Sequence, residues 1–270
     1  MPGKLAGKTA IVTGGASGIG RAIARRYASE GAAVSIADQN SAGGEQTVEM
    51  IRQQGGEATF VLCDVGRAEQ VQALVDGVAE KAGRLDIVVN VAGIGAGGKA
   101  ESCSVEDFQR VVAVNLCGPF YAAKFAIPHL RRAGGGSIIN ISSVYGIIAA
   151  PNVPAYCASK GGLIMLTKQL AVDYSHENIR VNCICPGYVN TDMGGRRARM
   201  APDDAARALA NREAKAAMQP IGRQADPEEM AGAAVFLASD DATFAVGSIL
   251  VVDGGESILH NIGPYFEPGI

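Results

Sequence analysis

Short apolar runs alternate with longer amphipathic stretches along nearly the whole chain. The short runs are rich in Val and Ile and lack the polar alternation of a strand with one wet face, which is typical of strands covered on both sides in a parallel sheet. They predict seven strands, at residues 9–13, 33–38, 58–64, 85–90, 137–142, 180–185 and 248–252. The stretches between them predict helices at residues 19–29, 41–54, 68–82, 104–132, 155–175 and 227–238.

Glycine and proline mark the ends of these elements. Gly31, Gly55 and Gly83 follow helical stretches, where a left-handed residue commonly ends a helix, and Asp226-Pro227 is typical of a helix start. Regular alternation of strand and helix, with right-handed crossovers, predicts one doubly wound α/β domain over residues 1–270 with helices on both faces of the sheet. Residues 187–225 are too long for a connector, so they predict a partly helical substrate lid.

Composition and charge narrow the class of protein. With 48% hydrophobic and 19% charged residues, the chain can bury a large core and is predicted to be globular. A net charge of -3 provides no basic surface for nucleic acid. The sequence lacks an apolar run near the roughly 18 residues of a membrane helix, and its start, MPGKLAG, lacks the apolar stretch of a secretory signal. We therefore expect a cytoplasmic protein without a membrane partner.

Cysteine and histidine usage argues against disulfides and metals. The six cysteines are spread over the chain without C-x-x-C spacing, which favours buried free thiols. The three histidines are far apart in the sequence, so no metal site is predicted.

A glycine-rich turn, TGGASGIG at residues 13–20, directly follows the first strand. Glycines at such a turn let a diphosphate approach the helix N-terminus, whose free N–H groups and dipole favour anions. A P-loop is excluded because no Lys-Ser/Thr pair follows, and the spacing also departs from G-x-G-x-x-G. The predicted cofactor-binding residues of this turn are Gly14, Ser17, Gly18, Ile19 and Gly20.

Asp38 ends the second predicted strand, close to the offset at which an acidic residue meets the adenosine ribose of a dinucleotide. A carboxylate there hydrogen-bonds the 2′-hydroxyl and repels a 2′-phosphate, and neither Ser17 nor Gln39 supplies a compensating cation. NAD is therefore favoured over NADP, although Asp38 could also merely cap the turn that follows.

Further motifs occur in a fixed order between residues 5 and 255. They are Asp64-Val65, Asn90-Val91-Ala92-Gly93, Asn115, Ser142-Ser143, Tyr156-x-x-x-Lys160 and Pro186-Gly187. With the glycine turn, they make the sequence resemble the short-chain dehydrogenase/reductase superfamily, in its subfamily of about 250 residues. Val91 replaces the second Asn of the family's usual motif, which we expect to affect local stability more than chemistry. The resemblance implies a Rossmann-type fold.

Tyr156 and Lys160 lie four positions apart, on one face of a predicted helix. A nearby cation can lower a pKa by about 1 to 3 units, so Lys160 is expected to lower the pKa of the phenol. The resemblance implies that Tyr156 exchanges a proton with the substrate oxygen and that Ser143, rather than Ser142, hydrogen-bonds that oxygen. It also implies that Lys160 holds the nicotinamide ribose.

The resemblance assigns further residues to the proton relay and the cofactor. Asn115 would hold a water that extends the relay from Lys160, although asparagine inside a helix would ordinarily face solvent. The implied cofactor contacts are Asp64, Val65, Asn90, Ala92, Gly93, Tyr156, Lys160, Pro186, Gly187, Val189 and Thr191. Pro186-Gly187 could equally be a turn that ends a strand.

The implied activity is that of an NAD-dependent alcohol dehydrogenase or carbonyl reductase. An acyl-carrier-protein ketoreductase is the enzymatic alternative, but Asp38 argues against its usual NADP preference. A non-catalytic dinucleotide sensor is the alternative of another class, and the complete set of Ser143, Tyr156 and Lys160 argues against it.

Substrate and assembly are less constrained by the sequence. Residues 94–100, 144–154 and 188–220 are expected to surround the substrate, and they offer Ile147, Ile148, Tyr188 and Met193 with little fixed charge. These residues favour an uncharged cyclic or aromatic secondary alcohol. The resemblance implies a homotetramer joined through the helices at 104–132 and 155–175 and through the last helix and strand. The apolar tail 256–270 is expected to pack across a subunit boundary.

Overall fold

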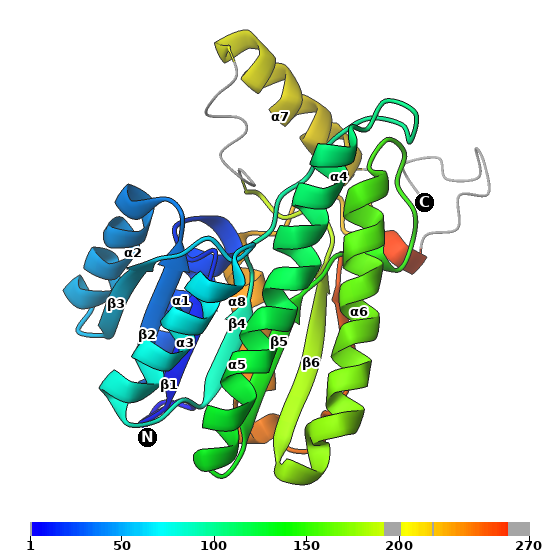
Figure 1. Ribbon diagram of the computed structural model, residues 1–270. Helices are drawn as coiled ribbons and strands as arrows, with labels where there is room; N and C mark the ends of the chain where they lie inside the picture. Colours follow the sequence, from blue (N-terminus) through cyan, green and yellow to red (C-terminus); the bar gives the residue numbers. More distant parts are fainter. Residues whose placement is uncertain (1, 192–200, 218, 259–270) are drawn as a thin grey trace.

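The computed structural model describes residues 2–191, 201–217 and 219–258. Seven parallel strands form one sheet in the order β3-β2-β1-β4-β5-β6-β7 (Figure 1). Their bounds are β1 Thr9–Thr13, β2 Ala33–Asp38, β3 Glu57–Leu62, β4 Ile87–Asn90, β5 Gly136–Ile141, β6 Ile179–Pro186 and β7 Ile249–Val252. The order runs outward in opposite directions from the β1/β4 pair, so this pair is the switch point at which such sheets bind ligands.

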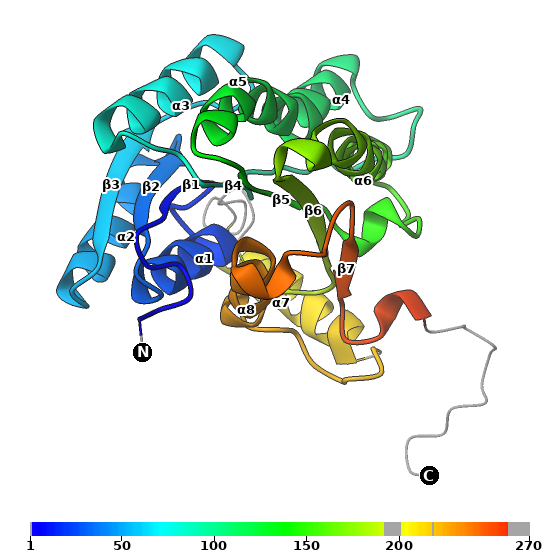
Figure 2. The ribbon, with the colours of Figure 1, turned by 90° about the horizontal axis from the view of Figure 1, so that it is seen from below.

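Helices cover both faces of the sheet (Figure 2). One face carries α1 (Gly18–Ser29), α2 (Ser41–Gln53) and α8 (Pro227–Ala238). The other carries α3 (Ala68–Ala82), α4 (Val105–Val112), α5 (Gly118–Arg132) and α6 (Pro154–Tyr174). Each face buries its own apolar cluster against the strands. The predicted doubly wound, seven-stranded α/β fold is therefore confirmed.

Strand positions agree closely with the prediction, and their ends differ by one or two residues. β1 and β2 begin and end as expected, and so do α3 and α8. β4 begins two residues later than predicted. The Asp86 carboxylate just before it accepts the Thr9 N–H at 2.9 Å and pairs with Arg84 at 2.6 Å.

The helix predicted over 104–132 is present, but its middle is π-helical rather than α-helical. A π-helical segment, Ala113–Cys117, separates α4 from α5. It contains Asn115, whose side chain bonds the backbone of Ile94 outside the helix at 2.9 Å. Single π turns are common at functional sites, because the extra residue redirects a side chain.

The combined stretch Val105–Arg132 is long and apolar enough to cross a membrane by length and composition, which differs from the sequence expectation. In the fold its α5 part packs against α3, β4 and β5 and buries Ala123, Ala126 and Leu130. This is the position of a core helix in a soluble protein.

Details of the turns and thiols follow the sequence expectation. Gly31, Gly55 and Gly83 have positive φ angles of 89°, 79° and 71°, as the helix ends require. All six cysteines are free thiols, and Cys63, Cys183 and Cys185 are buried.

The lid segment contains α7 (Pro202–Ala217), so its helical content is confirmed, and α7 projects beyond the carboxyl edge of the sheet (Figure 1). Residues 192–200, including Met193, lie outside the described residues. Of the tail, residues 256–258 form a short helical turn and residues 259–270 lie outside the described residues.

Candidate active site

The glycine turn closes tightly around the N-terminus of α1. Gly14 has φ +69°, and a Cβ there would lie 2.8 Å from the backbone of Ala92. A Cβ on Gly20 would lie 2.1 Å from the Gly14 carbonyl oxygen. Ser17 is the N-cap residue of α1, and Ile19 begins its packing on the core. Only glycine fits at positions 14 and 20. The turn leaves the N-terminus of α1 open to an anion, which fits a dinucleotide diphosphate.

Asp38 lies at the carboxyl end of β2, directly beside this turn. Its Oδ2 accepts the Ala16 N–H at 3.1 Å and its Oδ1 accepts the Asn40 N–H at 2.9 Å. Two backbone donors thus fix the carboxylate. Because a carboxylate offers about four acceptor sites, capacity remains for ribose hydroxyls.

The turn after β4 is held against β1. The Thr13 hydroxyl accepts the N–H groups of Val91 at 3.1 Å and Ala92 at 3.2 Å. The Asn90 amide is used inside the sheet, where it donates to Asn140 at 2.8 Å. Asn90 and Ala92 thus lie at the switch point, and their contact with the cofactor stays a prediction.

Asp64 and Val65 follow β3 at the same edge of the sheet. The Asp64 carboxylate accepts the Gly66 N–H at 2.9 Å, and Val65 is buried beneath the start of α5. Their proposed contact with adenine stays a prediction.

Ser143, Tyr156 and Lys160 meet beyond the carboxyl end of β5. The Ser143 side chain lies close enough to the Tyr156 hydroxyl to lower the pKa of the phenol. The Lys160 Nζ lies 5.6 Å from the centre of the Tyr156 ring and donates to the Ile141 carbonyl at 2.7 Å. Ser142 instead donates to the Lys160 carbonyl at 2.8 Å, so it supports α6 rather than the substrate. The fold thus brings together the three residues that the sequence singled out.

The electrostatics of this group differ from the sequence expectation. Burial raises the pKa of Tyr156, and the neighbouring Ser143 side chain opposes that rise. Burial lowers the pKa of Lys160 to about 8, so its ammonium is still mostly protonated at neutral pH. In this structure the pKa of Tyr156 is thus governed by burial and Ser143, rather than lowered by Lys160 as expected.

Asn115 is fully buried beside this group. Its amide donates to Ser159 at 3.1 Å, in addition to its two bonds with Ile94. A Cβ on Gly93 would lie 3.4 Å from the Asn115 Oδ1 and 3.5 Å from the Lys160 Nζ, so all three residues converge. The expectation that Asn115 faces the Lys160 region rather than solvent agrees with this placement, and its water remains a prediction.

The segment predicted to be a lid begins at Gly187, directly after β6. A Cβ on Gly187 would lie 2.8 Å from the Asp253 backbone, so β7 closes this side. Arg212 of α7 donates to the carbonyls of Val189 at 2.6 Å and Thr191 at 2.7 Å. Thr191 also lies against Gly18, because a Cβ there would be 3.0 Å from its methyl carbon. The lid base therefore lies directly over the glycine turn.

Several residues in contact with the site were not predicted. Arg21 donates to the Thr47 hydroxyl at 3.0 Å and also bonds the Ala16 carbonyl, which braces the glycine turn against α2. The Tyr145 N–H donates to Ser143, and the Glu256 carboxyl lies near the Tyr145 phenol, where little fixed charge was expected. No sequence motif marks these contacts, since they join segments far apart in the chain.

These side chains can carry out proton transfer. A phenol beside a serine hydroxyl, with an ammonium nearby, can move a proton to or from a substrate oxygen and stabilise charge on it. The adjacent glycine turn can hold a dinucleotide.

Comparisons with known proteins agree with this geometry. The family described as Enoyl-(Acyl carrier protein) reductase matches residues 14–257. The chain is 43% identical to 3beta-hydroxysteroid dehydrogenase 1 of Eggerthella lenta, covering 94% of this chain and 95% of that protein. It is 42% identical to cis-4-hydroxycyclohexanecarboxylate dehydrogenase of Sinomonas cyclohexanicum, covering 92% and 96%.

A solved structure from Beutenbergia cavernae, described as an NAD(P)-dependent gluconate 5-dehydrogenase with bound NADP at low occupancy, is also similar. It is 38% identical, covers 94% of this chain and 98% of that chain, and has a TM-score of 0.84. The chain therefore belongs to the short-chain dehydrogenase/reductase superfamily and is an oxidoreductase of the kind that uses a nicotinamide dinucleotide.

Proposed function

We propose that this protein is a cytoplasmic NAD(H)-dependent dehydrogenase that interconverts an uncharged cyclic or aromatic secondary alcohol and its ketone. The observation that carries the proposal is the meeting of Ser143, Tyr156 and Lys160 at the carboxyl end of β5, next to the glycine turn. Asp38, fixed beside that turn, supports NAD. Relatives named for a 3beta-hydroxysteroid and for cis-4-hydroxycyclohexanecarboxylate support a cyclic alcohol.

The three catalytic residues have different roles in the proposed proton transfer. In alcohol oxidation, the Tyr156 phenolate takes the hydroxyl proton, and in ketone reduction the phenol returns it. The Ser143 hydroxyl hydrogen-bonds the same substrate oxygen, which stabilises charge as it develops. Lys160, held by the Ile141 carbonyl, keeps a positive charge close to the phenol ring. The nicotinamide, when bound, accepts or supplies the hydride.

The chain's residues also hold the cofactor. Gly14, Ser17 and Gly20 would receive the diphosphate at the N-terminus of α1, and Asp38 would bind the adenosine ribose. Lys160 would bind the nicotinamide ribose, while Val189 and Thr191 at the lid base would reach the carboxamide. Apolar side chains beside the site, including the exposed Ile147, suit an uncharged ring.

A panel of alcohols tests this function. Purified protein with NAD and a set of cyclic secondary alcohols should form NADH, which is measured by its absorbance at about 340 nm. A non-catalytic sensor would bind NAD and form no NADH with any alcohol or ketone. An acyl-carrier-protein ketoreductase would instead require a thioester substrate and NADPH.

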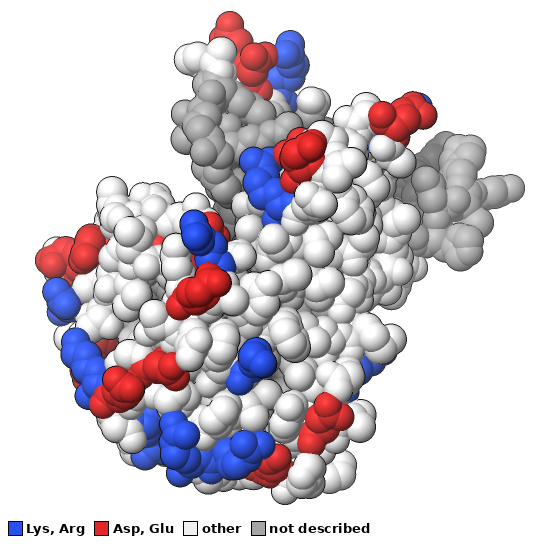
Figure 3. Space-filling model, in the orientation of Figure 1, with Lys and Arg blue, Asp and Glu red and all other residues white. Residues whose placement is uncertain are grey.

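We also propose a homotetramer. Apolar side chains are exposed on two faces of the monomer. On α4, α5 and α6 they are Val105, Phe108, Phe120, Met165 and Val172, and near α8 and β7 they are Phe236, Phe244, Val246 and Val251. The surface over the middle of α5 and α6 carries few charged side chains (Figure 3). Two such faces can build a closed tetramer with twofold symmetry, since each pairs with its own copy.

Val172, which is 78% exposed on α6, provides the test of assembly. Val172→Glu should convert the tetramer to dimers, because it places paired like charges at an apolar interface without disturbing the monomer core. Light scattering coupled to size-exclusion chromatography measures the mass. Ala42→Glu, at an exposed position on α2, is the matched control and should leave the mass unchanged. A monomeric wild-type protein at micromolar concentration would refute the tetramer.

A further inference from the structure

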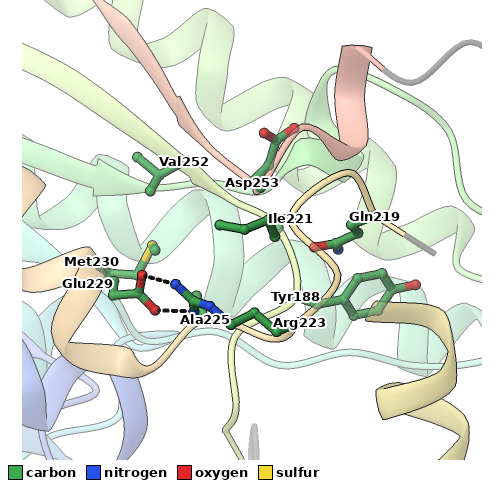
Figure 4. A pocket seen from close by; sticks show the side chains of 11 residues that line it. Tyr188, Gln219, Ile221, Arg223, Ala225, Glu229, Met230, Val252 and Asp253 are labelled. Atoms are coloured by element: carbon green, nitrogen blue, oxygen red, sulfur yellow. Dashed lines mark hydrogen bonds and ion pairs between the residues drawn. The ribbon is translucent and has the colours of Figure 1, made fainter. Parts of the chain in front are cut away.

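A second group of polar side chains lies at the same edge of the sheet, outside the proton-transfer residues. Tyr145 follows β5 and Tyr188 follows β6. Gln219 follows α7, and Glu256 follows β7. The hydroxyls of Tyr145 and Tyr188 are 2.8 Å apart, and the Gln219 amide donates to Glu256 at 3.1 Å. The Glu256 carboxyl lies close enough to Tyr145 for its charge to raise the pKa of that phenol. Tyr188 and Gln219 also border a cavity of about 90 Å³, on the side away from the Arg223–Glu229 ion pair (Figure 4).

Packing holds the Glu256 backbone in place. The Asp253 carboxylate accepts the N–H groups of Gly255 at 2.9 Å and Ser257 at 2.7 Å. A Cβ on Gly254 would lie 2.4 Å from the Ile221 side chain, so this turn presses directly on the end of the lid. Glu256 is consequently partly buried, which raises its pKa, and it differs from an ordinary surface glutamate.

The cluster adjoins the catalytic serine. The Tyr145 N–H donates to the Ser143 Oγ at 3.1 Å, and Tyr188 directly follows Gly187 at the start of the lid. The Tyr145 backbone thus contacts the catalytic serine, and the Tyr188 hydroxyl lies beside that of Tyr145.

A count of hydrogen-bonding capacity shows what the cluster can bind. Each phenol has one proton, so Tyr145 can donate to Glu256 while Tyr188 donates to Tyr145. Gln219 donates to one carboxylate oxygen of Glu256. A carboxylate offers about four acceptor sites, and the Tyr188 oxygen can also accept. The cluster therefore has acceptors in excess, which suits a ligand that donates a hydrogen bond and carries no negative charge.

We propose that Glu256 and Tyr188 form a second-hydroxyl subsite and that the preferred substrates are uncharged diols. One hydroxyl would react at Tyr156, and the other would donate a hydrogen bond to the Glu256 carboxylate beside Tyr188. This inference rests on the proposed dehydrogenase function and makes its substrate class narrower. The carboxylate also disfavours hydroxy acids, because a substrate carboxylate would meet a like charge.

Matched alcohols test the subsite. The kcat/KM of the wild-type protein with NAD is measured for cyclohexanol and for the cis and trans isomers of cyclohexane-1,2-diol, -1,3-diol and -1,4-diol. At least one diol should exceed cyclohexanol by about tenfold or more, the usual effect of a hydrogen bond to a charged group. Glu256→Gln should lower kcat/KM for that diol by a similar factor and leave that for cyclohexanol nearly unchanged.

Two further variants separate recognition from structure. Glu228→Gln makes the same charge change at an exposed position on α8 and should alter neither alcohol. Tyr188→Phe removes one hydroxyl while keeping the ring, and it should also lower the diol preference, which provides a test if Glu256→Gln fails to fold. Equal losses for diol and cyclohexanol, or the absence of any diol preference, overturn the subsite while leaving the dehydrogenase in place. Failure to oxidise any alcohol overturns the proposed function itself.

Discussion

Tyr156→Phe should lower kcat by about 100- to 10,000-fold, the usual contribution of a general acid or base. The variant loses only the hydroxyl, which lies beside Ser143 and is the group proposed to exchange the proton. The ring remains to pack beneath Lys160, and the glycine turn and Asp38 lie on other elements. Dinucleotide affinity, measured by calorimetry, should therefore stay close to that of the wild-type protein.

Tyr121→Phe is the matched control, because it removes a hydroxyl from α5 at a position beside Phe120 rather than in the catalytic group. Its kcat should equal that of the wild-type protein. A Tyr156→Phe protein that retained more than about a tenth of the wild-type kcat would show that another group carries the proton.

The same assignment predicts how the rate depends on pH. Burial raises the pKa of Tyr156, so the phenolate that oxidation requires becomes more abundant as the pH increases. Alcohol oxidation should thus accelerate from neutral pH upward, while ketone reduction, which needs the phenol, should slow. A flat oxidation profile with hydride transfer shown to be rate-limiting contradicts the assignment.

The fold could be predicted because its signals are local and repeated. The β1 sequence TAIVT and the β2 sequence AVSIAD are largely apolar runs of strand length. The π-helical segment between α4 and α5 could not be predicted, because the sequence of Val105–Arg132 is that of one long apolar helix. The π turn at Asn115 depends on Ile94, 21 residues earlier, whose backbone bonds the asparagine amide. Such a contact is tertiary and leaves no periodic signal.

The candidate site, like the fold, could be predicted from the sequence only in part. The spacing of Tyr156 and Lys160 follows from helix geometry, so their shared face could be predicted from the sequence. Their pKa values depend on burial, which the sequence does not display, and the Ile141 carbonyl that holds Lys160 lies 19 positions earlier. The Tyr145, Tyr188 and Glu256 cluster gathers three loops that meet only because β5, β6 and β7 are neighbours in the sheet.

Cofactor choice depends on one carboxylate, and the family relationship alone leaves it open, since a relative 38% identical to this chain binds NADP. The backbone N–H groups of Ala16 and Asn40 hold the Asp38 carboxylate at the end of β2. A 2′-phosphate about 4 Å from it would meet a repulsion of about 4 kcal/mol at an intermediate dielectric constant. We therefore expect kcat/KM with NAD to exceed that with NADP by about 100-fold or more.

Substitutions at Asp38 separate its charge from its shape. Asp38→Ala should narrow the preference, and Asp38→Asn should do so while keeping an acceptor oxygen for the turn, because the repulsion comes from the charge. Glu45→Ala removes a charge from an exposed position on α2 and should leave the ratio of NAD to NADP unchanged. Steady-state kinetics with both cofactors and one alcohol measure the ratio. If NADP already equals NAD in the wild-type protein, the Asp38 carboxylate does not contact the adenosine ribose, and its bonds to Ala16 and Asn40 serve only to cap the turn after β2.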